Sequence, residues 1–184
     1  MIKKIICSGA GGQGVLTVGM IIAHAAASQD LHITWVPEYG SEMRGGTASC
    51  KVKISDNAIG SPFVQNPDIL VAMNENAIET YGKDIEEDGC IIYNSSIITE
   101  IPVGTDYEMY GIPAYEIARE YDNTRGVGIA IIGGVFAYSK LLSLEAALNA
   151  LTDYFEHKGI DPQKNIQVFQ AGYVYMNKLI TETM

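Results

Sequence analysis

Basic residues, clustered cysteines and long apolar runs are all scarce in this chain of 184 residues. Lysine and arginine together number 12 against 22 acidic residues, which gives a net charge of −10. A field of that sign repels a phosphate backbone, so the composition argues against nucleic-acid binding. The three cysteines, at positions 7, 50 and 90, are too far apart for the paired-cysteine motifs of zinc or iron–sulfur proteins. We therefore expect free, buried thiols, as in a protein of the reducing cytoplasm.

No apolar run is long enough to cross a membrane. The longest, residues 127–138, has 12 residues, whereas a helix that spans a bilayer needs about 20. The N-terminus begins like a signal peptide, with two lysines before apolar residues, but glycines at 11, 12 and 14 interrupt the apolar segment. Apolar residues make up 47% of the chain and charged residues 18%, which is typical of a folded domain. We predict a single domain over residues 1–184, with no signal peptide and no membrane association.

Predicted strands and helices alternate along most of the chain. The pattern predicts strands at 2–7, 32–36, 47–54, 69–73, 90–93 and 107–110, and helices at 15–28, 128–142, 144–157 and 163–181. We expect Pro37 to stop the second strand. Residues 47–54 alternate between apolar and polar side chains, which predicts an antiparallel or edge strand. The fold class is therefore α/β, with a mainly parallel, twisted sheet, helices on both faces and a Rossmann-like start.

Two of the predicted helices, residues 15–27 and 129–142, are apolar almost all the way round. A helix on the surface of a small domain normally has one apolar stripe and one polar face. Burial in the centre of the domain explains one such helix. Two such helices in one domain are expected to form a subunit interface, either with other subunits or, in the isolated chain, with a second copy.

A glycine-rich turn joins the first predicted strand to the first helix. Gly9, Gly11, Gly12, Gln13 and Gly14 form a G-x-G-x-x-G pattern in the position where that motif binds phosphate. A dinucleotide site also needs an acid at the end of the second strand, and the candidate there, Glu38, follows a proline. Three interpretations stay open: an NAD site, a contact with another phosphate-bearing ligand or domain, and a structural tight turn.

Residues 39–46, YGSEMRGG, form a second glycine-rich loop between two strands. Its candidate binding residues are Tyr39, Glu42, Arg44, Gly45 and Gly46. Arginine beside paired glycines offers a planar charged donor next to free backbone N–H groups, which suits a carboxylate or phosphate. The alternative is a surface ion pair between Glu42 and Arg44, which contributes little to stability.

Two asparagines, Asn74 and Asn94, each follow a strand that is predicted to be buried. Ligands gather at the carboxyl ends of strands in an open parallel sheet, so both are candidate binding residues. Asparagine also caps helices, and for Asn74 that alternative is equally good. The sequence shows no nucleophile–base pair, no metal-ligand cluster and no P-loop lysine, so we predict no catalytic residue and no metal site in this chain.

Several segments, taken in order, closely resemble the gamma subunit of 2-oxoacid:ferredoxin oxidoreductases. They are GAGGQG at 9–14, YGSEMRGG at 39–46, IGSP at 59–62, NPD at 66–68, AMN at 72–74, IYNS at 92–95 and FQAGY at 169–173. The resemblance covers nearly the whole chain. The segment around IGSP and NPD is most similar to the 2-oxoglutarate or branched-chain 2-oxoacid types.

The resemblance implies a cytoplasmic complex that oxidises a 2-oxoacid with coenzyme A to acyl-CoA and CO2 and passes the electrons to ferredoxin. Thiamine diphosphate and iron–sulfur clusters would lie on partner alpha and beta subunits and on a ferredoxin-like delta subunit. Residues 11–14 and 42–46 would then face a shared active site or the phosphates of coenzyme A. Relatives often carry an asparagine in the turn into the long apolar helix, where this chain reads RGVG at 125–128.

Two other functions compete with this one. A stand-alone oxidoreductase would use the first glycine loop to bind a nicotinamide or flavin cofactor. A non-enzymatic α/β interaction module would use the apolar helices to bind a partner.

Overall fold

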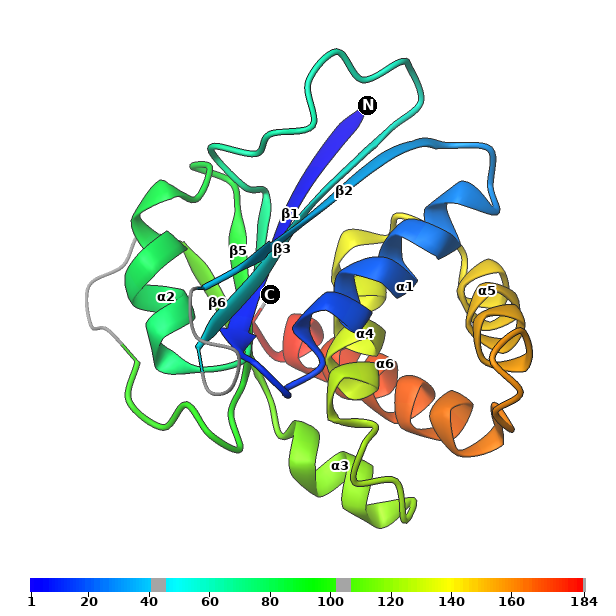
Figure 1. The fold of residues 1–184 in the computed structure, drawn as a ribbon. Coiled ribbons are helices and arrows are strands. Elements are labelled where there is room, and N and C mark those ends of the chain that lie inside the picture. Colours follow the sequence, from blue (N-terminus) through cyan, green and yellow to red (C-terminus); the bar gives the residue numbers. More distant parts are fainter. Residues whose placement is uncertain (41–45, 102–106, 184) are drawn as a thin grey trace.

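The computed structural model describes residues 1–40, 46–101 and 107–183, and these contain a six-stranded sheet with the order β2-β3-β1-β4-β5-β6 (Figure 1). The strands are β1 (Ile2–Ala10), β2 (His32–Tyr39), β3 (Thr47–Ser55), β4 (Ile69–Ala72), β5 (Cys90–Asn94) and β6 (Glu108–Ile112). Strands β1, β4, β5 and β6 pair in parallel, while β3 pairs antiparallel with both β1 and β2. Strand β3 therefore runs against the other five, which confirms a mainly parallel sheet.

The prediction for residues 47–54 is confirmed in direction, because β3 is antiparallel. It is an inner strand, however, and β2 forms the edge. The prediction that Pro37 stops β2 is wrong, since the strand continues to Tyr39 and Pro37 lies opposite Cys50. An edge strand tolerates proline because one side of it has no ladder that needs the missing N–H group.

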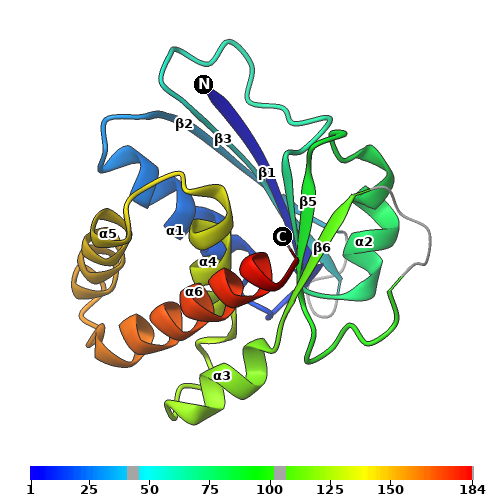
Figure 2. The same cartoon turned by 180° about the vertical axis from the view of Figure 1, so that it is seen from behind.

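Helices cover both faces of the sheet, but unequally (Figures 1 and 2). They are α1 (Val15–Ala27), α2 (Glu75–Tyr81), α3 (Ala114–Glu120), α4 (Val127–Ser139), α5 (Leu144–Glu156) and α6 (Gln163–Thr183), with a 3-10 turn, η1 (Gly82–Asp84), after α2. Helices α1, α4, α5 and α6 share one core with one face of the sheet, whereas α2 packs on the opposite face. Helices α2 and α3 have seven residues each, too few for apolar periodicity to reveal them in the sequence.

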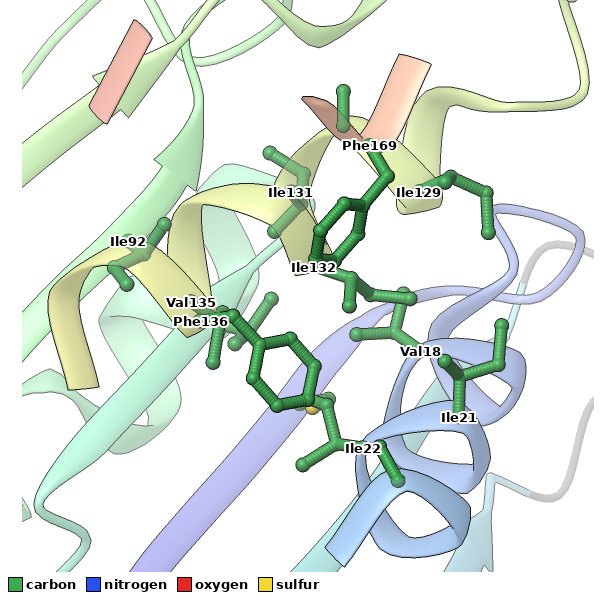
Figure 3. Close-up of a cluster of buried hydrophobic side chains, with 14 of the residues drawn as sticks. Val18, Ile21, Ile22, Ile92, Ile129, Ile131, Ile132, Val135, Phe136 and Phe169 are labelled. Atoms are coloured by element: carbon green, nitrogen blue, oxygen red, sulfur yellow. The ribbon is translucent and has the colours of Figure 1, made fainter. Parts of the chain in front are cut away.

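Helix α4 lies at the centre of the larger core, and every residue from Val127 to Ala137 is buried. Figure 3 shows Ile132 and Phe136 of this helix among Ile21 and Ile22 of α1 and Phe169 of α6. The domain's own elements thus cover the apolar surface of α4. Helix α1 has an exposed side that includes Thr17, Met20 and His24. The apolar character of α4 is therefore explained within the domain, and a subunit interface through these helices stays a prediction.

Helices α4 and α6 cross at two glycines. A Cβ atom on Gly133 would lie 2.1 Å from the carbonyl oxygen of Phe169, and one on Gly172 would lie 2.0 Å from that of Ala130. Both distances are far below van der Waals contact, so the two backbones approach as closely as they do only because neither residue has a side chain.

Gly172→Ala should lower the free energy of unfolding by about 2 kcal/mol, because the added methyl group forces the two helices apart. The gain in helix propensity, about 1 kcal/mol, is too small to offset this cost. Urea unfolding followed by circular dichroism measures the change. Gly60→Ala is the control, since a Cβ atom there meets no atom within 4 Å, and it should stay within about 0.5 kcal/mol of the wild type. Equal stability of both variants would contradict the predicted crossing.

Candidate functional site

A pocket of about 420 Å³ lies at the edge of the sheet where β1, β4 and β5 end and α1 and α4 begin. It is lined by Gly12, Gln13, Gly14, Thr17, Val18, Met73, Asn94, Tyr115, Thr124, Arg125, Val127, Gly128 and Ile129. This is the carboxyl edge of the parallel strands, where open α/β sheets bind their ligands. Four of the predicted site residues, Gly12, Gln13, Gly14 and Asn94, line this pocket.

The first glycine loop depends on its glycines for two different reasons. Gly12 and Gly14 have φ angles of +96° and +78°, in the left-handed region that side chains disfavour. Gly9 instead lies under the loop, where a Cβ atom would come within 2.6 Å of both the Gln13 Oε1 and the Met73 Cβ. Gly9 therefore allows the Gln13 side chain and Met73 to pack against the backbone of the turn, and it does not line the pocket.

The side chain of Gln13 fastens this loop to the sheet. Its Oε1 accepts a hydrogen bond from the Ala10 N–H at 2.6 Å, and its Nε2 donates to the Met73 carbonyl at 3.2 Å. The loop at the end of β1 is thereby joined to the residue that follows β4. Gln13 shapes the pocket as well as lining it.

The two glycine-rich loops meet at this edge. The Gly11 N–H donates to the Gly46 carbonyl at 2.9 Å, and the Gly40 N–H donates to the Thr47 carbonyl at 2.7 Å. Tyr39 is 74% exposed at the end of β2. The predicted residues Glu42, Arg44 and Gly45 lie outside the described residues.

The two candidate asparagines have different surroundings. Asn74 caps α2, since its Oδ1 accepts from the Ala77 N–H at 3.0 Å, and it does not line the pocket. Asn94 is completely buried and lines the pocket; its Oδ1 accepts from the Ser96 N–H at 3.2 Å. Its Nδ2 group is buried without a hydrogen-bond partner among the described residues. A buried donor of this kind is costly unless a ligand or water uses it.

The pocket favours an anion. Arg125 is the one charged residue in the described lining, and its side chain is exposed. Helices α1 and α4 begin at the pocket with Gly14 and Gly126 as N-caps, without a capping side chain and without an acid in the first turn. Helix N-termini carry unpaired N–H groups and a partial positive charge. Together these groups suit phosphate or carboxylate.

Sequence reasoning missed four lining residues with polar side chains: Thr17, Tyr115, Thr124 and Arg125. Arg125 was detectable in principle, because it is one of three arginines and immediately precedes the glycine that caps α4. The other three carry no comparable signal in the sequence.

A dinucleotide site of the usual geometry does not form here. Strand β3 lies between β1 and β2, so Glu38 is not on the strand next to the glycine loop. Glu38 also accepts a hydrogen bond from the Lys51 Nζ at 2.8 Å and one from the Ser49 Oγ at 3.3 Å. The Ser49 hydroxyl contacts Tyr81 of α2, so this cluster lies on the face opposite α1. The carboxylate is thus turned away from the loop whose ribose it would bind.

Some further features are defined for the described part of the chain. Cys7, Cys50 and Cys90 are buried free thiols, as predicted. Burial raises the pKa of Cys90 to about 12.

In residues 1–40, 46–101 and 107–183, no group of three or more histidine, cysteine or acidic side chains is placed to bind a metal ion. In the same ranges, no helix is both long and apolar enough to cross a membrane.

Comparison with known sequences identifies relatives over nearly the whole chain. A family model described as pyruvate ferredoxin/flavodoxin oxidoreductase matches residues 4–175. Ketoisovalerate oxidoreductase subunit VorA of Methanothermobacter thermautotrophicus is 36% identical over 92% of this chain, which spans only 35% of that protein's length. 2-Oxoglutarate synthase subunit KorC of Methanocaldococcus jannaschii is 35% identical, and the match covers 97% of this chain and 96% of KorC.

Two solved structures have the same fold. The gamma subunit of a keto/oxoacid ferredoxin oxidoreductase from Geobacter sulfurreducens superimposes with a TM-score of 0.79 at 28% identity, covering 95% of this chain and 98% of that one. A 2-oxoglutarate:ferredoxin oxidoreductase from Magnetococcus marinus, with 2-oxoglutarate, coenzyme A and succinyl-CoA bound, gives a TM-score of 0.86 at 23% identity. That match covers 96% of this chain and 31% of the other, and it concerns the fold alone.

Gln13→Ala should lower the free energy of unfolding by about 1–2 kcal/mol, because the Ala10 N–H and the Met73 carbonyl both lose their partner. Gln13→Glu keeps the acceptor for Ala10 but loses the donor to Met73, so its effect should be smaller. Urea unfolding compares the two variants. If Gln13→Ala is as stable as the wild type, the side chain does not fasten the loop.

Proposed function

The chain belongs to the pyruvate ferredoxin/flavodoxin oxidoreductase family, and we propose that it is the gamma subunit of a 2-oxoacid:ferredoxin oxidoreductase complex in the cytoplasm. Such a complex converts a 2-oxoacid and coenzyme A into acyl-CoA and CO2 and passes two electrons to ferredoxin. The observation that carries the proposal is the match to KorC, a subunit of nearly the same length, over almost the whole of both chains. The gamma subunit from Geobacter sulfurreducens supports it through the same fold.

The lining of the pocket fits a supporting role. Among the described residues it offers an arginine, two amides and three hydroxyl groups, but no histidine, cysteine or carboxylate that could act as a base or nucleophile. We therefore assign the thiamine diphosphate and iron–sulfur chemistry to alpha, beta and ferredoxin-like delta subunits.

Coenzyme A is the ligand that we propose for the shared site. Its phosphates match the positive charge of Arg125, the free Nδ2 of Asn94 and the N-termini of α1 and α4. A pocket of about 420 Å³ encloses only part of a molecule of that size, so partner subunits would complete the site. By analogy, the Magnetococcus marinus enzyme contains bound coenzyme A. In this role the chain orients the acceptor thiol toward an acyl intermediate held elsewhere.

The substrate that we propose is 2-oxoglutarate or a branched-chain 2-oxoacid. The two relatives are subunits of a 2-oxoglutarate synthase and a ketoisovalerate oxidoreductase, with nearly equal identities of 35% and 36%. Comparison therefore favours neither of these two substrates over the other.

Purification of the tagged chain from its native source tests the proposal as a whole. Larger subunits with thiamine and iron should copurify, and the complex should reduce a dye in the presence of coenzyme A and one of several 2-oxoacids. A stable homodimer that never recruits such subunits would instead support the interaction-module alternative.

Arg125→Ala in the reconstituted complex should raise the KM for coenzyme A about 10- to 100-fold, as expected for the loss of a hydrogen bond to a charged group. Decarboxylation of the 2-oxoacid without coenzyme A should stay unchanged, because that step does not involve this pocket. Steady-state and single-turnover kinetics separate the two effects. Arg44→Ala is expected to act in the same direction.

Arg119→Ala is the matched control for this measurement. Arg119 is exposed on α3 and does not line the pocket, so its loss removes the same charge without the proposed contact. An equal loss of both rates in the Arg125→Ala complex would argue against a specific role in binding coenzyme A.

A further inference from the structure

Cys7 and Cys50 lie directly opposite each other in the antiparallel ladder between β1 and β3. Residues so paired have Cα atoms about 4.5–5.5 Å apart, within the range of about 4.4–6.8 Å that a disulfide spans. Both side chains are completely buried on the face of the sheet that α1 covers, and each thiol shifts the pKa of the other. The proposed function does not use either thiol.

The surroundings make the two sulfurs unequal. The Cys7 thiol is the main cause of a lowered pKa at Cys50, and the Trp35 indole N–H and the Gly19 backbone N–H add to this effect against the opposing effect of burial. The same pairing, together with burial, raises the pKa of Cys7. On this basis we take Cys50 as the attacking thiol and Cys7 as the resolving one, and the reverse order would give the same disulfide.

The Cys50 sulfur also contacts the first helix close to the glycine loop. Its S–H donates to the carbonyl of Val15, the first residue of α1, at 3.6 Å. Space for the sulfur exists because Gly19 has no side chain, since a Cβ atom there would lie 2.3 Å away. A change at Cys50 therefore alters a contact of the residue that directly follows Gly14.

We propose that Cys7 and Cys50 form an oxidative modification site in which a peroxide converts the two thiols into a cross-strand disulfide. The Cys50 thiolate attacks one oxygen of hydrogen peroxide, which gives a sulfenic acid and releases hydroxide. The Cys7 sulfur then attacks the Cys50 sulfur, so that the S–S bond forms and the sulfenic oxygen leaves as water. In sum, two thiols and one peroxide give one disulfide and two waters. Hydrogen peroxide is hardly larger than water, which suits a buried pair.

The reduced, folded full-length chain treated with excess hydrogen peroxide tests this site. Intact mass should fall by two hydrogens per chain, and peptide mapping should join the peptide of Cys7 to that of Cys50. Trp35, the single tryptophan, lies beside the Cys50 sulfur, so its fluorescence should decrease as the disulfide forms and recover with dithiothreitol. The wild-type measurement alone decides the pairing, whether or not the variants fold.

Three variants sharpen the test. Cys7→Ala and Cys50→Ala should each abolish the mass loss and the reversible change in fluorescence. Cys90→Ala should leave both unchanged, because this equally buried strand cysteine has no thiol opposite it and its pKa is raised to about 12. The proposal is overturned if the disulfide includes Cys90, if only oxygen adducts form, or if the Cys7–Cys50 bond appears only after unfolding in urea.

Discussion

The burial of α4 is the constraint on which the other features depend. A helix that is apolar on every side must be covered all round, and here the sheet, α1, α5 and α6 cover it. Gly133 and Gly172 let α6 pack directly on its backbone. Because α4 is fixed in this way, its N-terminus with Arg125 is held at the carboxyl edge of the sheet, beside the start of α1. The core thus places the charged residue of the pocket.

The glycine loop is held from the other side by polar contacts. Gln13 joins the end of β1 to the residue after β4, and the Gly11 N–H joins the same loop to Gly46. Cys50 of β3 contacts Val15 just beyond the loop. Contacts from three strands, β1, β3 and β4, therefore hold one turn. The N–H groups at the start of α1 are thus held in place before any ligand binds, and such preorganisation lowers the entropic cost of binding.

Local rules predicted the parts of the structure that depend on neighbouring residues. The strand–glycine turn–helix unit and the position of Asn94 after a buried strand follow from short-range pattern, and the cap at Asn74 was one of the two alternatives open for that residue. The strand order did not, because the insertion of β3 between β1 and β2 depends on which strands pair in space. Arg125 was missed for the same reason, since it reaches the pocket through the packing of α4. The Glu42–Arg44 part of the second loop lies outside the described residues, so its role stays a prediction.

The same geometry explains why the glycine-rich start does not make this a dinucleotide enzyme. The turn and the helix N-terminus attract phosphate in any such fold, but Glu38, the acid that would select a ribose, faces the opposite side of the sheet. What stands near the turn instead is a second helix N-terminus with an arginine and a buried amide donor. These groups have the chemistry to bind an anion, and the described lining adds no histidine, cysteine or carboxylate to act on it. Under the proposed function, another chain contributes the reacting groups that complete this site.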